Sequence, residues 1–161
     1  MVLVSRVRTA ALAAMVAALA GLTGWLGLRD HQDREGQRLR QEMVQAARQG
    51  AVNLTTIDHR RAEQDVQRIL DSSTGAFRDD FAARAGSFID AAEKTQSTSV
   101  GTVTEAGLES VSGDEGRVLV TLTVMTSNRG VPEQQPKAWR MRVTVANTGE
   151  GLKVAEVEFV P

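Results

Sequence analysis

Residues 117–127 read RVLVTLTVMTS, and this stretch decides the fold. From Val118 to Val124 every second side chain is apolar, and leucine or threonine stands between them. Successive side chains of a strand point to opposite faces of a sheet, so the alternation predicts a strand with one buried face. The period of two starts near Gln96, after a region with the period of a helix. The last third of the chain is therefore expected to form a sheet.

Three more strands are expected around this one, and turn-forming residues separate them. The four predicted strands cover residues 99–111, 117–127, 138–146 and 152–160. The third alternates most cleanly, with Trp139 and Met141 among its inward-facing residues. In the last strand the apolar phase slips between Val154 and Ala155, as a β-bulge would cause.

Two helices are expected before the sheet, at residues 62–72 and 75–94. The second has the stronger apolar face, and it carries three of the four phenylalanines of the chain. Its apolar stripe comprises Phe77, Phe81, Ala85, Phe88 and Ala92, with Ile89 beside it. This pattern predicts that the helix at 75–94 is the core helix.

Residues 29–60 are expected to form a helical stalk, which leaves an α+β domain at 61–161. The stalk carries a thin apolar stripe of Leu39, Met43, Ala46, Gly50, Asn53 and Ile57. Glycine and asparagine are poor residues for a coiled-coil seam, so self-pairing is not expected. The stripe is expected to pack on the sheet of the domain, or on a helix of a partner.

The N-terminal segment has the features of a membrane anchor. Residues 9–28 contain no charge, and as a helix they would span about 30 Å, the thickness of a bilayer core. Arg6 and Arg8 precede the span, which predicts a cytoplasmic tail at 1–8 and a domain outside the cytoplasm. The expected location is the inner (plasma) membrane, with one span in contact with lipid. A cleaved signal peptide is the alternative, because residues 18–20 offer an A-x-A site.

Composition and motifs exclude several classes of function. Basic and acidic residues nearly balance, 19 against 20, so no nucleic-acid partner is indicated. The absence of cysteine excludes disulfides and thiolate chemistry, and His31 and His59 are too isolated to form a metal site. Asp79 and Asp80 are adjacent, so they point in different directions from a helix. We therefore predict no catalytic, cofactor-binding or metal-binding residue, no cofactor, and no enzyme.

The expected order is three helices and then four antiparallel strands, an α+β fold with helices on one face of a curved sheet. This cone-like plan resembles the superfamily of ketosteroid isomerase and nuclear transport factor. The periplasmic domains of certain type IV secretion scaffold proteins have the same order.

Four segments also resemble the Mce-associated membrane proteins, which accompany mammalian-cell-entry lipid transporters. These segments are Asn53–Asp58 (NLTTID), Ile69–Phe81 (ILDSSTGAFRDDF), Trp139–Val145 (WRMRVTV) and Val157–Pro161 (VEFVP). Two positions depart from the family pattern, namely Trp139 in place of tyrosine and Leu152-Lys153 where tryptophan commonly follows the last turn. The resemblance implies a non-enzymatic accessory or scaffold subunit of an Mce-type lipid import system, with Mce transporter proteins as partners.

Two other functions stay open at this point. A type IV secretion-like scaffold would have the same anchor and the same cone-like domain. A membrane-anchored module for a small apolar ligand would cup that ligand between the sheet and the third helix, among Phe77, Phe81, Phe88 and Trp139.

The anchor prediction can be tested by membrane fractionation and mass spectrometry of the chain. We expect the full-length chain to stay in the membrane fraction after an alkaline carbonate wash and to keep residues 9–20, which a cut after Ala20 would remove. A variant with Val16→Arg and Leu19→Arg should leave that fraction, because each arginine costs about 3 kcal/mol at the centre of a span. A mature chain that begins at Gly21 would contradict the anchor and support cleavage.

Overall fold

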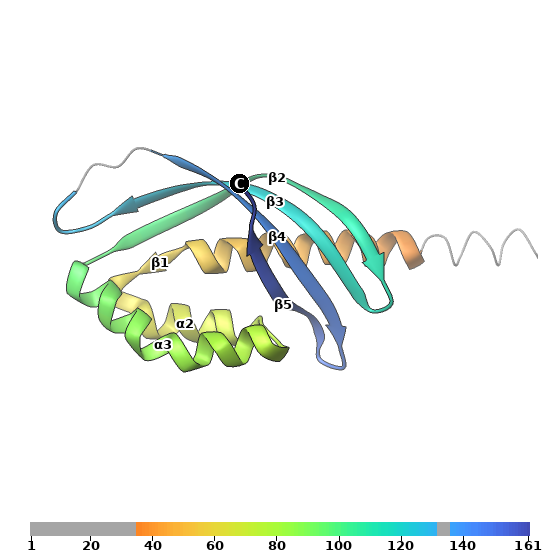
Figure 1. Cartoon of the computed structure of the whole chain (residues 1–161), viewed down its shortest axis with the longest axis horizontal. Coiled ribbons are helices and arrows are strands. Elements are labelled where there is room, and N and C mark those ends of the chain that lie inside the picture. Colours follow the sequence, from red (N-terminus) through yellow and green to blue (C-terminus); the bar gives the residue numbers. More distant parts are fainter. Residues whose placement is uncertain (1–34, 132–135) are drawn as a thin grey trace, which may run out of the picture. The chain divides into compact units, whose positions relative to one another are not determined.

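The sheet expected from the alternating residues is present, and each strand runs antiparallel to its neighbours (Figure 1). The computed structural model describes residues 35–131 and 136–161, and the compact unit considered below is Arg40–Pro161. The strand order is β1-β2-β3-β4-β5, so every strand pairs with the next along the chain. The strands are β1 Ile57–Asp58, β2 Thr98–Ser112, β3 Glu115–Ser127, β4 Lys137–Thr148 and β5 Gly151–Phe159.

The prediction of four strands is wrong by one, because the sheet has five. The additional strand is β1, which has two residues and pairs Ile57 with Ser99 and Asp58 with Thr98. Two residues are too few to show an alternating pattern, so residues 57–58 were expected at the end of the stalk at 29–60. Ile57 is only 6% exposed, and its burial joins the first helix to the edge of the sheet.

The bulge predicted in the last strand is confirmed. Val145 pairs with Val154 and Thr144 pairs with Glu156, which leaves Ala155 without a partner on β4. The extra residue allows both Val154 and Val157 to face the helices, although they are three residues apart.

The first helix covers residues 35–55 and supplies the main packing surface under the sheet from Arg40 onward. Met43, Ala47 and Ala51 are fully buried in this unit. A Cβ atom on Gly50 would lie 2.5 Å from Cγ2 of Val154, and one on Gly116 would lie 2.5 Å from Sδ of Met43. The helix therefore lies closer to the sheet than larger side chains would permit. Residues 40–60, expected within a stalk, belong to the same compact unit as the α+β domain.

The other helices lie on the same side of the sheet as the first helix (Figure 1). They are the 3-10 helix η1 His59–Arg61, α2 Ala62–Asp71 and α3 Gly75–Thr95, close to the expected 62–72 and 75–94. Helix α2 buries Val66 and Ile69, as an amphipathic helix should. The expectation that the helix at 75–94 is the core helix is wrong, because Ala92 is the one buried residue of α3, all of which the structure describes. The first helix occupies the sheet face that α3 was expected to cover.

In the described part of the chain, every helix is too short or too polar to serve as a membrane span. The span expected at 9–28 and the tail at 1–8 lie outside the described residues.

Two glycine substitutions test the close packing of the first helix. Gly50→Ala should destabilise the fold by about 1–2 kcal/mol, because overpacking against the stiff side chain of Val154 outweighs the gain in helix propensity. Gly86→Ala is the matched control, because nothing lies within 4 Å of its added Cβ atom. That control should stabilise the fold by about 1 kcal/mol. Chemical denaturation followed by circular dichroism measures both effects, and two stabilising changes would contradict the packing.

Candidate functional site

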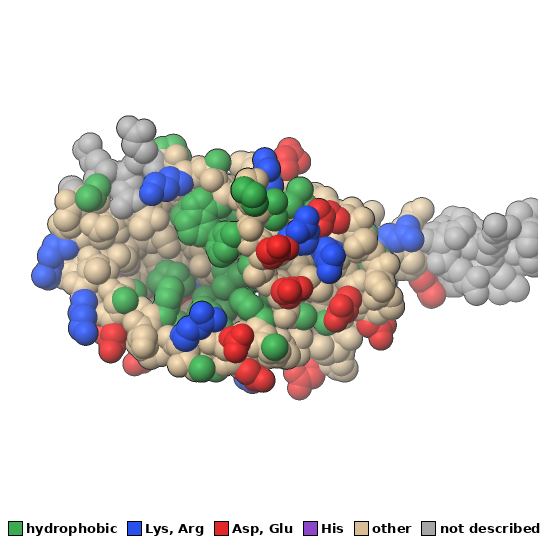
Figure 2. All heavy atoms as spheres, in the orientation of Figure 1, with side chains coloured by type: hydrophobic (Ala, Val, Ile, Leu, Met, Phe, Trp, Pro, Cys, Tyr) green, Lys and Arg blue, Asp and Glu red, His purple; other side chains and the backbone are tan. Residues whose placement is uncertain are grey.

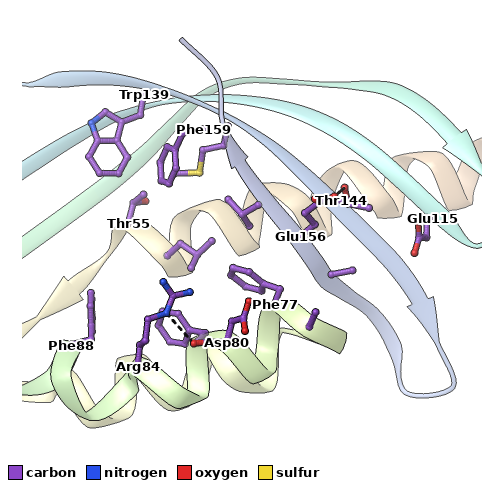
Figure 3. Close-up of a pocket in the computed structure, with 16 residues that line it drawn as sticks. Thr55, Phe77, Asp80, Arg84, Phe88, Glu115, Trp139, Thr144, Glu156 and Phe159 are labelled. Carbon is purple, nitrogen blue, oxygen red and sulfur yellow. Dashed lines mark hydrogen bonds between the residues drawn. The ribbon is translucent and has the colours of Figure 1, made fainter.

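An open cleft of about 860 Å³ lies between α3 and the part of the sheet formed by β4 and β5. Figure 2 shows hydrophobic side chains gathered in this hollow, with charged side chains around it. The rings that line it are Phe77, Phe81, Phe88, Trp139 and Phe159, so the cleft collects all four phenylalanines of the chain. Figure 3 shows the rings of Trp139 and Phe159 on the sheet side and those of Phe77 and Phe88 on the α3 side.

The rings form two groups that face each other across the cleft. On α3, Phe77 and Phe81 are stacked with centroids 6.3 Å apart, and Phe81 and Phe88 follow at 6.0 Å. On the sheet, Trp139 and Phe159 meet edge to face at 5.4 Å. These spacings are typical of favourable aromatic pairs. Each side of the cleft is therefore lined by rings that contact one another.

Several of these rings are unusually exposed for large apolar side chains. Phe159 is 62% exposed, Trp139 38% and Phe88 37%. Exposed apolar side chains that gather in one hollow commonly mark a binding site. The cleft is therefore the candidate functional site.

A smaller chamber of about 320 Å³ adjoins the cleft. The two share the lining residues Leu54, Thr55, Phe88 and Trp139. Thr55 is buried at this junction, and its Oγ1 donates a hydrogen bond of 2.7 Å to the carbonyl oxygen of Ala51. Since that hydroxyl is already satisfied within its own helix, the junction presents a largely apolar wall.

Four ionisable side chains border the cleft, namely Asp80, Arg84, Glu115 and Glu156. Nε of Arg84 donates to the backbone carbonyl of Asp80 at 3.1 Å, and Glu156 accepts from Oγ1 of Thr144 at 3.4 Å. Figure 3 shows Arg84 on the α3 side and Glu115 and Glu156 toward the other end. Among the described residues, no three histidine, cysteine or acidic side chains are grouped so that they could hold a metal ion.

The residues proposed from sequence for an apolar ligand do come together. Phe77, Phe81, Phe88 and Trp139 all line the cleft. Sequence reasoning missed Phe159, which reaches the site because it pairs with Met141 on β4. It also missed Arg84, although the spacing of four residues between Arg84 and Phe88 was a usable signal.

Two arginines of β4 do not line the cleft and are engaged elsewhere. Arg142 pairs with Glu109 at 2.7 Å and with Glu158 at 2.8 Å. The hydrogen bonds from Arg142 lower the pKa of Glu109. Arg140 donates to the carbonyl oxygen of Pro161 at 3.0 Å.

The histidines and the adjacent aspartates form no common site in the described residues. Nδ1 of His59 lies 3.3 Å from Oγ1 of Thr98, and His31 lies outside the described residues. Asp80 borders the cleft whereas Asp79 does not.

Substitutions in the cleft should show, by their effect on the free energy of unfolding, which lining residues belong to the core and which only form the surface of the cleft. Phe159→Ser should change the free energy of unfolding by less than about 1 kcal/mol, because the ring is largely exposed. Met141→Ala is the comparison, since Met141 also lines the cleft but is fully buried, and its loss should cost about 2–5 kcal/mol. Urea denaturation measures both, and equal costs would mean that Phe159 belongs to the core.

The fold is shared with several solved structures at low sequence identity. An IcmL-like type IV secretion system protein from Legionella pneumophila matches with a TM-score of 0.62 and 14% identity, over 76% of this chain and 92% of that one. The periplasmic domain of DotI matches with a TM-score of 0.57 and 13% identity, over 73% and 92%. An Ntf2-like protein involved in plasmid conjugation matches with a TM-score of 0.51 and 11% identity, over 76% and 49%. These likenesses establish an α+β fold of the Ntf2-like kind.

The sequence itself has a clear relative in Mycobacterium tuberculosis. It is 38% identical to the uncharacterized protein Rv1363c over 157 residues, which is 98% of this chain. The chain spans 60% of the length of that relative. The model of the family described as "Uncharacterized protein Rv1363c/MT1408-like" matches residues 4–161. The chain therefore belongs to the Rv1363c/MT1408-like family.

Proposed function

We propose that this chain is a non-enzymatic accessory or scaffold subunit of an assembly in the cell envelope. In this proposal residues 9–28 anchor the chain in the inner membrane, and the α+β domain lies outside the cytoplasm. The anchor is motivated by the uncharged span and by the arginines that precede it.

The fold is the observation that carries the scaffold role. The matched segment corresponds to 92% of the length of the IcmL-like protein and of the periplasmic domain of DotI. The first of these is by its description a type IV secretion system protein. This likeness of fold supports the proposal by analogy.

The proposal includes no catalytic step. Asp80 and Arg84 come from α3, whereas Glu115 and Glu156 come from two strands. In the described part of the chain, no ion pair joins any two of these four side chains. General acid–base catalysis needs titratable groups within hydrogen-bond reach of one reacting centre, and this dispersed set does not favour it.

For the identity of the assembly we propose an Mce-type lipid importer, with Mce transporter proteins as partners. The four segments that resemble Mce-associated membrane proteins motivate this choice. They fall at the end of the first helix with β1, at the junction of α2 and α3, on β4, and at the end of β5 with the residues that follow it. A type IV secretion-like scaffold is the second candidate, and the fold likeness favours it.

Affinity capture tests both candidates. The full-length chain, tagged at its N-terminus, would be purified from native membranes in a mild detergent, and its partners would be identified by mass spectrometry. We expect Mce proteins with their permease and ATPase. The variant with Val16→Arg and Leu19→Arg is the control, because loss of the anchor should abolish this capture.

Two other results would decide against the importer. Recovery of a secretion ATPase and its partners would support the type IV secretion-like scaffold. Recovery of the chain alone, from membranes in which the transporter is detected, would contradict a scaffold role and leave the ligand-binding module as the remaining candidate.

A further inference from the structure

The cleft and the smaller chamber together have the form of one elongated binding site. We propose that this site binds an amphiphile with a single apolar tail and an anionic head. The head lies at Arg84, and the tail runs between Phe88 and Trp139 into the smaller chamber. The inference concerns the cleft alone and goes beyond the proposed function, because it does not depend on which assembly contains the chain.

The smaller chamber is suited to an apolar tail because no ionisable side chain lines it. Its lining consists of apolar and hydroxyl side chains, namely Leu54, Thr55, Ile57, Phe88, Ala91, Ala92, Thr95, Ser97, Ser99, Val124, Thr126 and Trp139. The four residues that it shares with the cleft make the two spaces adjoin. Both volumes fall within the range of small-molecule sites, which are mostly apolar with a few polar groups.

Arg84 is placed to bind an anionic head at the boundary of the two spaces. It lies four residues before Phe88 on α3, so the two side chains are neighbours on one face of the helix. Nε of Arg84 is taken by the carbonyl oxygen of Asp80. In the part of the chain that the structure describes, no carboxylate lies within ion-pair distance of its guanidinium group. A guanidinium group can bind a carboxylate or phosphate through two parallel hydrogen bonds.

The acidic groups of the cleft favour one orientation of the ligand. Glu115 and Glu156 lie toward the end that is remote from Trp139 (Figure 3). Asp80 lies one helical turn before Arg84, on the side away from Phe88. An anionic head is therefore repelled from the acidic end and attracted to Arg84, beside the uncharged chamber.

Trp139 provides a direct probe of this binding mode. The chain has two tryptophans, so Trp25→Phe leaves Trp139 as the only one. The full chain with this change, in detergent micelles at pH 8, would be titrated with 11-bromoundecanoate and with its methyl ester. Bromine atoms quench tryptophan at short range, so saturable quenching reports a tail beside Trp139. We expect the acid to bind about tenfold more tightly than the ester, the size of one charge-assisted hydrogen bond.

Two arginine variants assign the head-group contact. Arg84→Gln should weaken binding of the acid about tenfold, to the level of the ester. Arg78→Gln is the matched control, because Arg78 is also on α3 and also donates from Nε to a backbone carbonyl, that of Leu70 at 3.1 Å, but does not line the cleft. The Arg78→Gln variant should bind the acid as tightly as the chain that carries only Trp25→Phe.

Any of three results would overturn the proposal: no saturable quenching, equal affinity for acid and ester, or equal weakening in both arginine variants. None of them depends on which proteins are captured with the chain. Failure of this test would therefore leave the scaffold proposal standing, and failure of the capture experiment would leave the binding site standing.

Discussion

The close approach of the first helix to the sheet is the constraint on which the rest of the structure depends. Small residues make it possible: Ala47, Gly50 and Ala51 on the helix, and Gly116 on the sheet. Because the helix lies so near, the inward-facing side chains of β3, β4 and β5 are covered by it and by each other. Dense packing of this kind tolerates little change of volume. The buried residues of the main core therefore come from the first helix and the sheet, and α3 adds the partly buried Phe77 at its edge.

The position of α3 follows from this arrangement. With the inner face of the sheet already occupied, α3 packs through Ala92 and Ile89 in a second cluster with Ile57, Ala62 and Ile69. Its phenylalanines line the cleft: Phe77 and Phe81 are partly buried against the two clusters, and Phe88 is exposed. The domain thus has one closely packed core and one open apolar cleft. Sheet residues such as Met141 belong to the core and also line the cleft. The rings are exposed because the first helix, and not α3, covers the inner face of the sheet.

The sheet could be predicted from the sequence because its signal is local. An alternation of apolar residues marks β3 and β4, and a change of phase marked the bulge at Ala155 in β5. The longest strand, β2, is only weakly patterned, and it was predicted from its position before a turn. The error about α3 has a different origin, since a stripe of period 3.6 shows which residues share a face but not whether anything covers that face. The first helix was not expected to be the main core helix, because its stripe at 40–55 contains glycine and alanine, which add little apolar area. These small residues stabilise the core by letting the helix approach the sheet closely. Phe159 was missed because the register of β5 brings it to the cleft, and the sequence does not show that register. Arg84 was missed because the position of α3 in the fold brings it there.

The ion pairs on the far side of the sheet have a consequence for the chemistry of the cleft. Residues 156–159 alternate between glutamate and an apolar residue, and Val157 and Phe159 lie on the helix side because of the register at the bulge. A slip of this segment by one residue would turn Phe159 away from the cleft and bring Glu158 toward it. Arg142, by holding Glu158 at 2.8 Å, opposes that slip. An ion pair on the solvent face of the sheet thus favours the register in which Val157 and Phe159 line the cleft.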